Sequence, residues 1–246
     1  MIPQGAVALI TGGARMGASL AAALAAAGAD VALSYRESSA PADAAIRGVS
    51  SAGRRGRAFQ ADLSSPSTCA RLVDDVIAWG GRLDILVCLA SVYERVPLEA
   101  LTADHWRAQL AVDLDASFHC ARAAALHMRV RGAGHIVLCS DWVAASGRPR
   151  YAGYVPYYVA KSGIVALTEA LALEVAGDGI LVNAVAPGPI LPAAGTTAAM
   201  QDAVIAATPL GRWGGSDAIT HTIVGLLQQE WVTGQVVRVD GGRHLE

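Results

Sequence analysis

The sequence predicts an α/β fold in which a parallel sheet of about seven strands is covered by helices on both faces. Short apolar runs alternate with helix-like segments along all 246 residues. Continuous apolar strands separated by helices are typical of parallel sheets that are buried on both faces. Because crossovers between parallel strands are right-handed, we expect a doubly wound, Rossmann-type domain.

Seven segments have the pattern of buried strands. Each is a short apolar run that ends at a turn or at the start of a helix-like stretch. The predicted strands are Ala6–Thr11, Asp30–Tyr35, Gly56–Leu63, Leu83–Ala90, Gly134–Ser140, Gly179–Pro187 and Gly234–Gly242.

Helix-like stretches lie between these strands, and Ala18–Ala27, Thr102–Arg131 and Tyr157–Ala176 are examples. The stretch Pro187–Trp213 is rich in Pro, Gly, Ala and Thr, so we expect a mobile loop and short helices beside the functional site. No linker or internal repeat divides the chain. We therefore predict one domain over residues 1–246, with a nucleotide-binding N-terminal half and a catalytic, substrate-binding C-terminal half.

Composition restricts the partners and the compartment. Hydrophobic residues make up 53% and charged residues 16% of the chain, as in a packed globular protein. The net charge is −2 and the longest basic run is Arg54–Arg57, which argues against nucleic acid or a membrane surface as a partner. The N-terminus lacks the charged segment and cleavage site of a signal peptide, so we expect a cytoplasmic protein.

The cysteines have no spacing that indicates a metal site. They are scattered, with no CxxC, and read as small buried apolar residues in a reducing compartment. We therefore predict no bound metal. The cysteines are Cys69, Cys88, Cys120 and Cys139.

A glycine cluster in "LITGGARMG" (Leu9–Gly17) lies between the first predicted strand and its helix. Glycines at this place allow backbone N–H groups to approach a pyrophosphate at the helix N-terminus. The second strand ends in Ser34, Tyr35 and Arg36, where a site that prefers NAD usually has an acidic residue. Arg36 can pair with a 2′-phosphate, so we predict NADPH as the cofactor; the alternative is a solvated surface arginine.

Tyr157 and Lys161 form the candidate catalytic pair. Lys161 is the only lysine among 19 basic residues, and its i, i+4 spacing from Tyr157 places both on one helix face. A tyrosine hydroxyl has an ordinary pKa of about 10, and a nearby ammonium stabilises its phenolate. Lysine also offers a compact charge that the planar guanidinium of arginine does not replace. Tyr158, at i, i+3, is the less favoured partner.

The whole chain resembles the short-chain dehydrogenase/reductase family. The matching motifs occur in the family's order: "TGGARMG", "ADL" at Ala61–Leu63, "LVCLAS", "YYVAK", "VNAVAPGPI" and "VDGG". The resemblance implies an oxidoreductase that uses a dinucleotide, assembles as a homotetramer or homodimer, and exchanges a proton through Tyr157 with support from Lys161. It places the helix asparagine of the family at Asp113, which we include among the catalytic residues.

The same resemblance, together with the glycine turn and the second strand, gives the predicted cofactor site. Beside Tyr157 and Lys161, its residues are Gly12, Arg15, Met16, Gly17, Tyr35, Arg36, Asp62, Leu63, Ala90, Ser91, Pro187, Gly188 and Ile190.

Several positions depart from the family's pattern. The glycine turn is one residue shorter, the paired asparagines of the family are Cys88 and Leu89, and the segment before Tyr157 is about three residues longer. Asp141 stands where the family usually has a substrate-orienting serine. Its neighbour Ser140 should point the opposite way on an extended strand, so only one of the two can serve the site.

Asp141 followed by Trp142 resembles the pteridine reductase branch, and Tyr93 falls where those enzymes stack an aromatic side chain on the pterin. We therefore predict Tyr93, Asp141 and Trp142 as substrate residues. A protonated Asp141 could donate to a ring nitrogen, whereas an ionised one would oppose charge developing on a ketone oxygen. A strand-end aspartate that caps a loop is the structural alternative.

Three functions remain open from the sequence. The leading hypothesis is an NADPH-dependent reductase of a small molecule, with a pterin-like heterocycle favoured. A carbonyl reductase of the 3-oxoacyl type is the runner-up. The third is a degenerate member that binds nucleotide without catalysis, which the shortened glycine turn and the replaced asparagines motivate.

Overall fold

The computed structural model describes residues 2–12, 16–193 and 195–245. One sheet carries seven strands in the order β3-β2-β1-β4-β5-β6-β7, and every neighbouring pair is parallel. The predicted fold class is therefore confirmed. The strands are β1 (Val7–Thr11), β2 (Asp30–Tyr35), β3 (Gly56–Gln60), β4 (Ile85–Cys88), β5 (Gly134–Cys139), β6 (Ile180–Pro187) and β7 (Val236–Val239).

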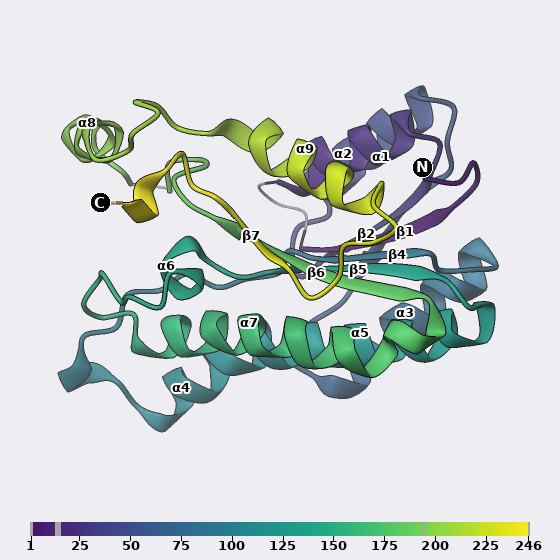
Figure 1. Cartoon of the computed structure of the whole chain (residues 1–246), viewed down its shortest axis with the longest axis horizontal. Helices are drawn as coiled ribbons and strands as arrows, with labels where there is room; N and C mark the ends of the chain where they lie inside the picture. The colour runs from purple at the N-terminus through teal and green to yellow at the C-terminus, as the bar shows by residue number, and fades with distance from the viewer. Residues whose placement is uncertain (1, 13–15, 194, 246) are drawn as a thin grey trace.

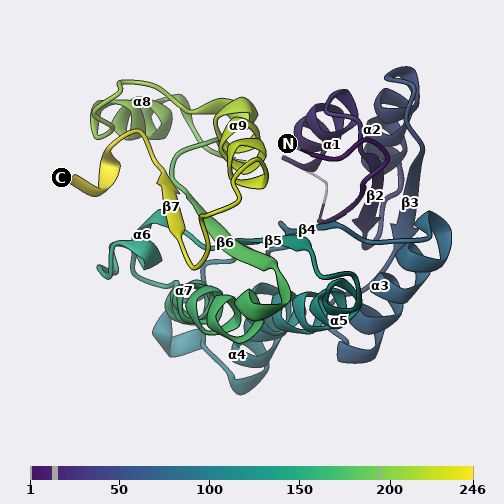
Figure 2. The same cartoon turned by 45° about the vertical axis from the view of Figure 1, so that its right-hand side comes forward.

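Helices cover both faces of the sheet (Figure 1, and Figure 2 in a turned view). One face carries α1 (Gly17–Ala26), α2 (Ala40–Ser51) and α9 (Gly215–Leu227). The other carries α3 (Pro66–Gly80), α5 (Ala116–Arg131) and α7 (Val155–Val175), with α4 (Ala103–Leu110) packed against α7.

Alternate residues of each strand pack on opposite faces of the sheet and form the two halves of the core. In β1, Val7 and Leu9 belong to the apolar cluster that includes residues of α3 and α5, whereas Ala8 and Ile10 belong to the cluster that includes residues of α1 and α9. Successive side chains of a strand point to opposite faces, so a strand buried on both faces is apolar at every position. All five residues of β1 are buried.

The strand order reverses between β1 and β4, because β2 and β3 lie on one side of β1 and the later strands on the other. Loops that follow neighbouring strands diverge at such a point, which leaves a crevice at the carboxyl ends. Four predicted strands extend further at their carboxyl ends than the observed ones. After Gln60, Cys88, Cys139 and Val239 the chain leaves the sheet and enters these loops.

The predicted helix Thr102–Arg131 consists of three consecutive pieces. Thr102 caps α4 by accepting a hydrogen bond from the His105 backbone N–H at 3.2 Å. A π-helical turn (Ala111–Asp115) then separates α4 from α5. Such a turn inserts one extra residue and redirects the side chains in it. It places Asp113 inward, where the side chain is buried.

In its described part, the stretch Pro187–Trp213 contains the helix α8 (Ala198–Ala206), and both the stretch and the helix border the cavity described below. The four cysteines are free and buried, as the sequence predicts. Among the described helices, none combines the length and the apolarity needed to cross a membrane.

Candidate active site

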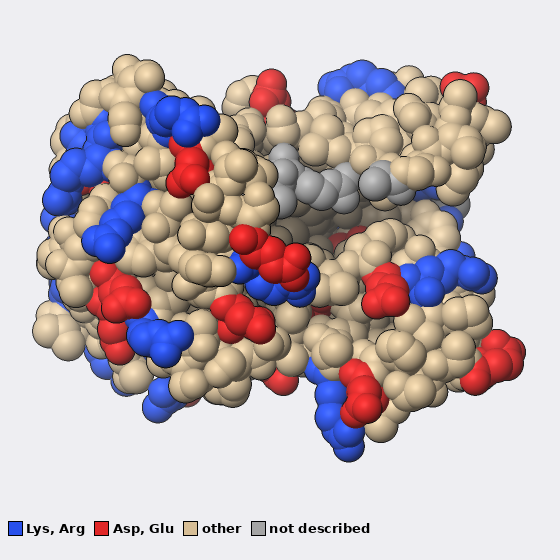
Figure 3. All heavy atoms as spheres, turned by 180° about the vertical axis from the view of Figure 1, so that it is seen from behind, with Lys and Arg blue, Asp and Glu red and all other residues tan. Residues whose placement is uncertain are grey.

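A cavity of about 1210 Å³ opens at the carboxyl ends of the strands. It is larger than the roughly 300–1,000 Å³ typical of a pocket for one small ligand, so it has room for a dinucleotide and a substrate together. The face shown in Figure 3 is hollowed, and its basic and acidic residues are interspersed. The ends of β1, β2, β4, β5 and β6 all contribute lining residues.

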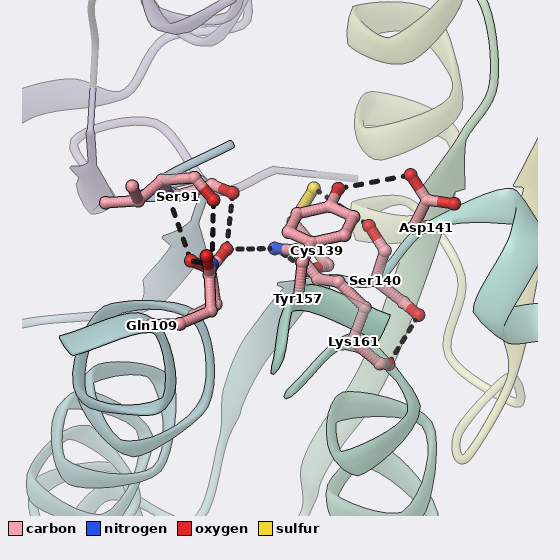
Figure 4. A network of polar contacts seen from close by, with 9 residues as sticks. Ser91, Gln109, Cys139, Ser140, Asp141, Tyr157 and Lys161 are labelled. Carbon is pink, nitrogen blue, oxygen red and sulfur yellow. Dashed lines mark hydrogen bonds and ion pairs between the residues drawn. The ribbon is translucent and has the colours of Figure 1, made fainter. Parts of the chain in front are cut away.

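Tyr157 lies in the first turns of α7 and lines this cavity. Its hydroxyl donates a hydrogen bond to Oδ2 of Asp141 at 3.1 Å (Figure 4). Burial raises the pKa of Tyr157 well above its ordinary value, and the negative charge of Asp141 adds to this. The phenol therefore stays protonated in the free protein and can act as a proton donor.

Lys161 lies one helical turn after Tyr157, with its ammonium 5.7 Å from the centroid of the tyrosine ring. Its Nζ donates to the Cys139 carbonyl at 2.9 Å and pairs with Oδ1 of Asp113 at 3.1 Å. Burial is the largest single influence on the pKa of Lys161 and would lower it, but the charge and hydrogen bond of Asp113, together with Cys139 and Asp141, outweigh burial and the pKa is raised. An ammonium has three N–H donors, so one remains for a ligand.

Asp113 is the buried counter-ion of Lys161. Its side chain has no exposed surface. Oδ1 accepts from the Ser91 hydroxyl as well as from Lys161, and Oδ2 accepts from the Val92 backbone N–H at 3.0 Å and from Nε2 of Gln109 at 2.5 Å. Asp113 does not touch the cavity in the described structure, so its geometry is that of a residue that positions Lys161.

Ser140 and Asp141 follow the end of β5 and both line the cavity, but they contact different parts of α7. Ser140 is 2% exposed, and its hydroxyl donates to the Lys161 carbonyl at 2.9 Å. Asp141 faces Tyr157 with Oδ2 and caps the short helix α6 (Trp142–Ala145) with Oδ1, which accepts from the Val143 N–H at 2.8 Å. Both interpretations of Asp141, loop cap and site residue, therefore apply to the same carboxylate. Burial raises the pKa of Asp141.

The rings of Tyr93, Tyr154 and Tyr157 contact one another beside Asp141. The ring of Tyr93 stacks on that of Tyr154, with the centroids 4.7 Å apart and the planes at 18°. The same ring meets Tyr157 edge-on at 4.9 Å. Tyr93 is 51% exposed, so part of its surface is open to a ligand although one face already has a partner.

Most residues predicted to bind a cofactor line the cavity. Gly12 has φ +74°, and a Cβ there would lie 2.5 Å from the Cα of Ala90, so only glycine fits this close approach of β1 to the chain after β4. The predicted cofactor residues that line the cavity are Gly12, Met16, Tyr35, Arg36, Asp62, Leu63, Ala90, Ser91, Pro187, Gly188 and Ile190, beside Tyr157 and Lys161.

Two predicted cofactor residues are placed differently. Gly17 is buried in the packing of α1, where an added Cβ would lie 3.2 Å from Cδ1 of Leu33, and it does not line the cavity. A small residue is needed at this position because the helix lies close to the sheet. Arg15, together with part of the shortened glycine turn, lies outside the described residues.

Arg36 lines the cavity beside an acidic neighbour that the sequence interpretation did not include. Its Nη2 pairs with Oε1 of Glu37 at 2.7 Å, and the two side chains are 60% and 78% exposed. Glu37 directly follows Arg36 in the sequence, so the presence of a carboxylate beside Arg36 could have been predicted.

Other residues of the site were also missed. Tyr154 lay in the motif next to Tyr157, and Gln109 is spaced i, i+4 from Asp113, so sequence spacing could have indicated both. Arg150 and Arg243 also line the cavity, but their distance in sequence from Tyr157 gave no signal.

Comparisons with known proteins agree with this arrangement. The family profile described as "Enoyl-(Acyl carrier protein) reductase" matches residues 13–244. The 3-oxoacyl-(acyl-carrier-protein) reductase FabG of Staphylococcus aureus is 32% identical over 245 residues, which cover 97% of this chain and 98% of the relative. The corresponding reductase of Synechocystis sp. is 31% identical over 240 residues, 96% of each chain.

Solved structures show the same likeness. A short-chain dehydrogenase/reductase from Serratia marcescens superposes with a TM-score of 0.91 at 31% identity and 98% coverage of both chains. A short-chain dehydrogenase from Burkholderia cenocepacia, solved in complex with NADP, gives 0.89 at 34% identity and the same coverage.

Fold and site together are those of a doubly wound α/β oxidoreductase. The chain belongs to the short-chain dehydrogenase/reductase family.

Proposed function

We propose that this protein is an NADPH-dependent reductase of a small molecule and that Tyr157 donates the proton. The observation that carries the proposal is the contact of Tyr157 with Asp141, next to Lys161, in a cavity large enough for cofactor and substrate. When bound, the cofactor supplies the hydride. Tyr157 holds the proton at its hydroxyl, and Lys161 offers its remaining N–H to a ribose hydroxyl or to the phenolate that forms.

We propose that the ribose that carries the 2′-phosphate of the cofactor lies at the carboxyl end of β2. Arg36 and Tyr35 line the cavity there, and the Burkholderia cenocepacia relative binds NADP. Glu37 weakens this preference because it pairs with Arg36 and would face a 2′-phosphate with like charge.

Two variants test the cofactor proposal in opposite directions. Arg36→Gln should weaken NADPH binding by about 1 kcal/mol, the scale of an exposed charge-assisted hydrogen bond, and leave NADH binding unchanged. Glu37→Gln should strengthen NADPH binding, because Arg36 loses its competing partner. Dissociation constants from fluorescence titration measure both. Equal changes for NADPH and NADH in either variant would contradict a role in reading the 2′-phosphate.

The substrate is proposed to contain a C=N bond in a heterocycle, such as a dihydropterin. Lys161 is already balanced by Asp113, so an ionised Asp141 adds a negative charge to a mostly buried site. That charge stabilises a protonated imine, whereas it opposes the oxyanion that forms from a ketone. The stacked rings of Tyr93 and Tyr154 offer an aromatic wall for a flat heterocycle.

A 3-oxoacyl compound is the second candidate. It is favoured by the similarity to the 3-oxoacyl-(acyl-carrier-protein) reductases of Staphylococcus aureus and Synechocystis. Reduction of a ketone here requires a protonated Asp141, which could donate a hydrogen bond to the carbonyl oxygen. The raised pKa of Asp141 favours that form relative to an exposed aspartate.

The experiment is a screen of dihydropterins, cyclic imines and 3-oxo esters with NADPH and with NADH, following the loss of reduced-cofactor absorbance. We expect turnover with NADPH, fastest with the C=N compounds.

Tyr157→Phe keeps the ring contacts and removes only the proton donor, so turnover should fall about 100-fold or more while NADPH binding stays within a few-fold. Comparable turnover in Tyr157→Phe would show that another group donates the proton. NADPH binding without turnover of any compound would favour the non-catalytic alternative.

We also propose a homotetramer or homodimer in the cytoplasm, with no nucleic-acid or membrane partner. The four free, buried cysteines suit a reducing compartment. Support for assembly comes from the exposed apolar side chains Phe118, Leu126 and Val130 of α5, which follow one another at intervals of eight and four residues.

A further inference from the structure

Gln109 of α4 is a buried amide that contacts both a carboxylate of the site and the chain after β4. It is 7% exposed and points toward the segment that contains Ser91 (Figure 4). Its Nε2 donates to the Val92 carbonyl at 2.8 Å and to Oδ2 of Asp113 at 2.5 Å. Both partners are oxygens, so only a nitrogen with two N–H groups satisfies them together, and this fixes the orientation of the amide.

Gln109 and Asp113 together hold both polar groups of the Val92 backbone. Oδ2 of Asp113 accepts from the Val92 N–H at 3.0 Å, while Gln109 donates to the carbonyl of the same residue. Asp113 also accepts from the Ser91 hydroxyl. The chain has left the sheet after Cys88, so these side chains satisfy the backbone as a neighbouring strand would.

The segment held in this way continues directly into the substrate side of the cavity. Tyr93 follows Val92, and its ring stacks on Tyr154 and meets Tyr157 edge-on. The place of Val92 therefore sets the place of this ring. All three residues that the sequence predicts to contact the substrate line the cavity: Tyr93, Asp141 and Trp142.

The second contact of Gln109 leads to the cofactor side. Oδ2 of Asp113 is held by Gln109, and Oδ1 of the same carboxylate pairs with Nζ of Lys161 at 3.1 Å. An apolar side chain at position 109 would leave the Val92 carbonyl without its donor and one oxygen of Asp113 with one donor fewer. The carboxylate would then turn toward other donors, and the ammonium that it holds would move with it.

We propose that Gln109 is a positioning residue of the reaction. Through Val92 it holds the ring of Tyr93 on the substrate side of the cavity. Through Asp113 it holds the ammonium of Lys161, which is proposed to meet the ribose of the cofactor. The inference rests on the proposed reductase function, and Gln109 itself takes no part in the proton transfer.

Gln109→Met keeps the length of the side chain and removes both N–H donors. We expect it to raise the KM of the fastest compound of the screen about 10-fold, the scale of one hydrogen bond to a charged group, and to weaken NADPH binding several-fold. Steady-state kinetics and fluorescence titration measure the two effects. Arg107→Met, on the same helix but 74% exposed, is the matched control and should change neither.

A double-mutant cycle with Tyr93→Ala separates positioning from a general loss of stability. In the Tyr93→Ala background the ring that Gln109 positions is absent, so Gln109→Met should no longer raise KM. Its weaker NADPH binding, which acts through Asp113, should persist. Changes in KM that multiply in the double variant, or an unchanged KM in Gln109→Met, would overturn the contact with Tyr93.

Gln109→Glu tests the contact with Asp113 through its dependence on pH. A protonated glutamic acid donates one hydrogen bond to Asp113, whereas an ionised one repels it, and two carboxylates this close share a proton. The other charged group at this place is Lys161, paired with Asp113. The dissociation constant of NADPH, variant over wild type, should therefore be near one at pH 6 and roughly 10 at pH 9. A ratio that does not change with pH would overturn the contact.

The NADPH titrations need no turnover, so they separate this proposal from the reductase proposal. The pH-dependent ratio in a protein that reduces no compound of the screen would keep the role of Gln109 at Asp113 and reject the reductase. Turnover that is equal in Gln109→Met and Arg107→Met would do the reverse. If Gln109→Met does not fold, the comparison of Gln109→Glu with itself at two pH values decides.

Discussion

Asp141 serves two contacts with one carboxylate, and this fixes its orientation. Oδ1 accepts from the Val143 N–H and Oδ2 from the Tyr157 hydroxyl. Ser140, on the opposite side of the strand end, donates to the backbone of α7. A serine at the family's usual place would have brought a hydroxyl to Tyr157, whereas this chain brings a group whose charge depends on pH.

The partly buried Asp141 gives a prediction for how stability depends on pH. Burial raises its folded-state pKa above the unfolded value of about 3.9, so the folded protein is favoured by protonation. The penalty is absent below the unfolded pKa and grows as pH rises through the folded pKa. Asp141→Asn keeps an oxygen for the Val143 N–H and carries no charge, so its melting temperature should exceed that of the wild type at pH 8.

Thermal unfolding by circular dichroism at pH 4.5 and pH 8 measures this difference, and the advantage of Asp141→Asn should shrink at the lower pH. Asp104→Asn is the control, because that carboxylate is exposed in α4. An advantage of equal size at both pH values would mean that the charge of Asp141 has no energetic cost in the folded protein.

The π-helical turn (Ala111–Asp115) explains why an aspartate stands at the family's asparagine position. Asp113 meets four donors: Ser91 and Lys161 at Oδ1, and Val92 and Gln109 at Oδ2. A carboxylate has acceptors on both oxygens, whereas an asparagine would turn an N–H₂ group toward two of these donors. The sequence showed the substitution, but the set of donors appears only when α4, α7 and the chain after β4 pack together.

This geometry predicts that Asp113→Asn is harmful although it restores the residue common in the family. Lys161 would lose its buried counter-ion, and the N–H groups of Val92 and Gln109 would lose their acceptor. We expect a loss of about 1–3 kcal/mol in the free energy of unfolding, the scale of unsatisfied buried hydrogen bonds, and slower turnover through a misplaced Lys161. Urea unfolding and a substrate assay measure the two effects.

Asp115→Asn, in the same turn but exposed, is the matched control and should change neither quantity by much. A fully stable and active Asp113→Asn variant would show that the four donors do not require a carboxylate.

At the scale of the whole molecule, the apolar runs of the sequence predicted the seven strands of the sheet. β2 begins and ends at the predicted residues, with the apolar Val31–Leu33 buried at its centre. Strand ends near the cavity were placed too far along, since apolar residues such as Leu63 and Leu89 continue the pattern after the ladder has ended. Burial in a loop and burial in a strand give the same signal in sequence.

Site residues could be predicted from the sequence where a motif or a helical spacing connects them. They could not be predicted where loops that are distant in the sequence come together. Tyr157 and Lys161 share a helix face, and Asp141, at the family's usual serine position, contacts Tyr157. The approach of Arg243 to Trp142 depends on how the turn after β7 lies against α6 and α8, which no local pattern encodes. The catalytic and binding roles stay predictions until the variants are measured.

The outer side of α5 supports the last prediction, which concerns assembly. Phe118, Leu126 and Val130 are 41%, 48% and 88% exposed, and their spacing by eight and four residues places them along one side of the helix. An exposed apolar row of this kind is typical of a helix that packs against another subunit. Light scattering after gel filtration should therefore give a mass of two or four chains. Leu126→Glu places a charge in the row and should shift the mass toward one chain, while Leu98→Glu, which lies outside α5 and is 73% exposed, should leave it unchanged. A wild-type protein that elutes as a single chain would reject assembly, and an unchanged mass in Leu126→Glu would place the interface on another face.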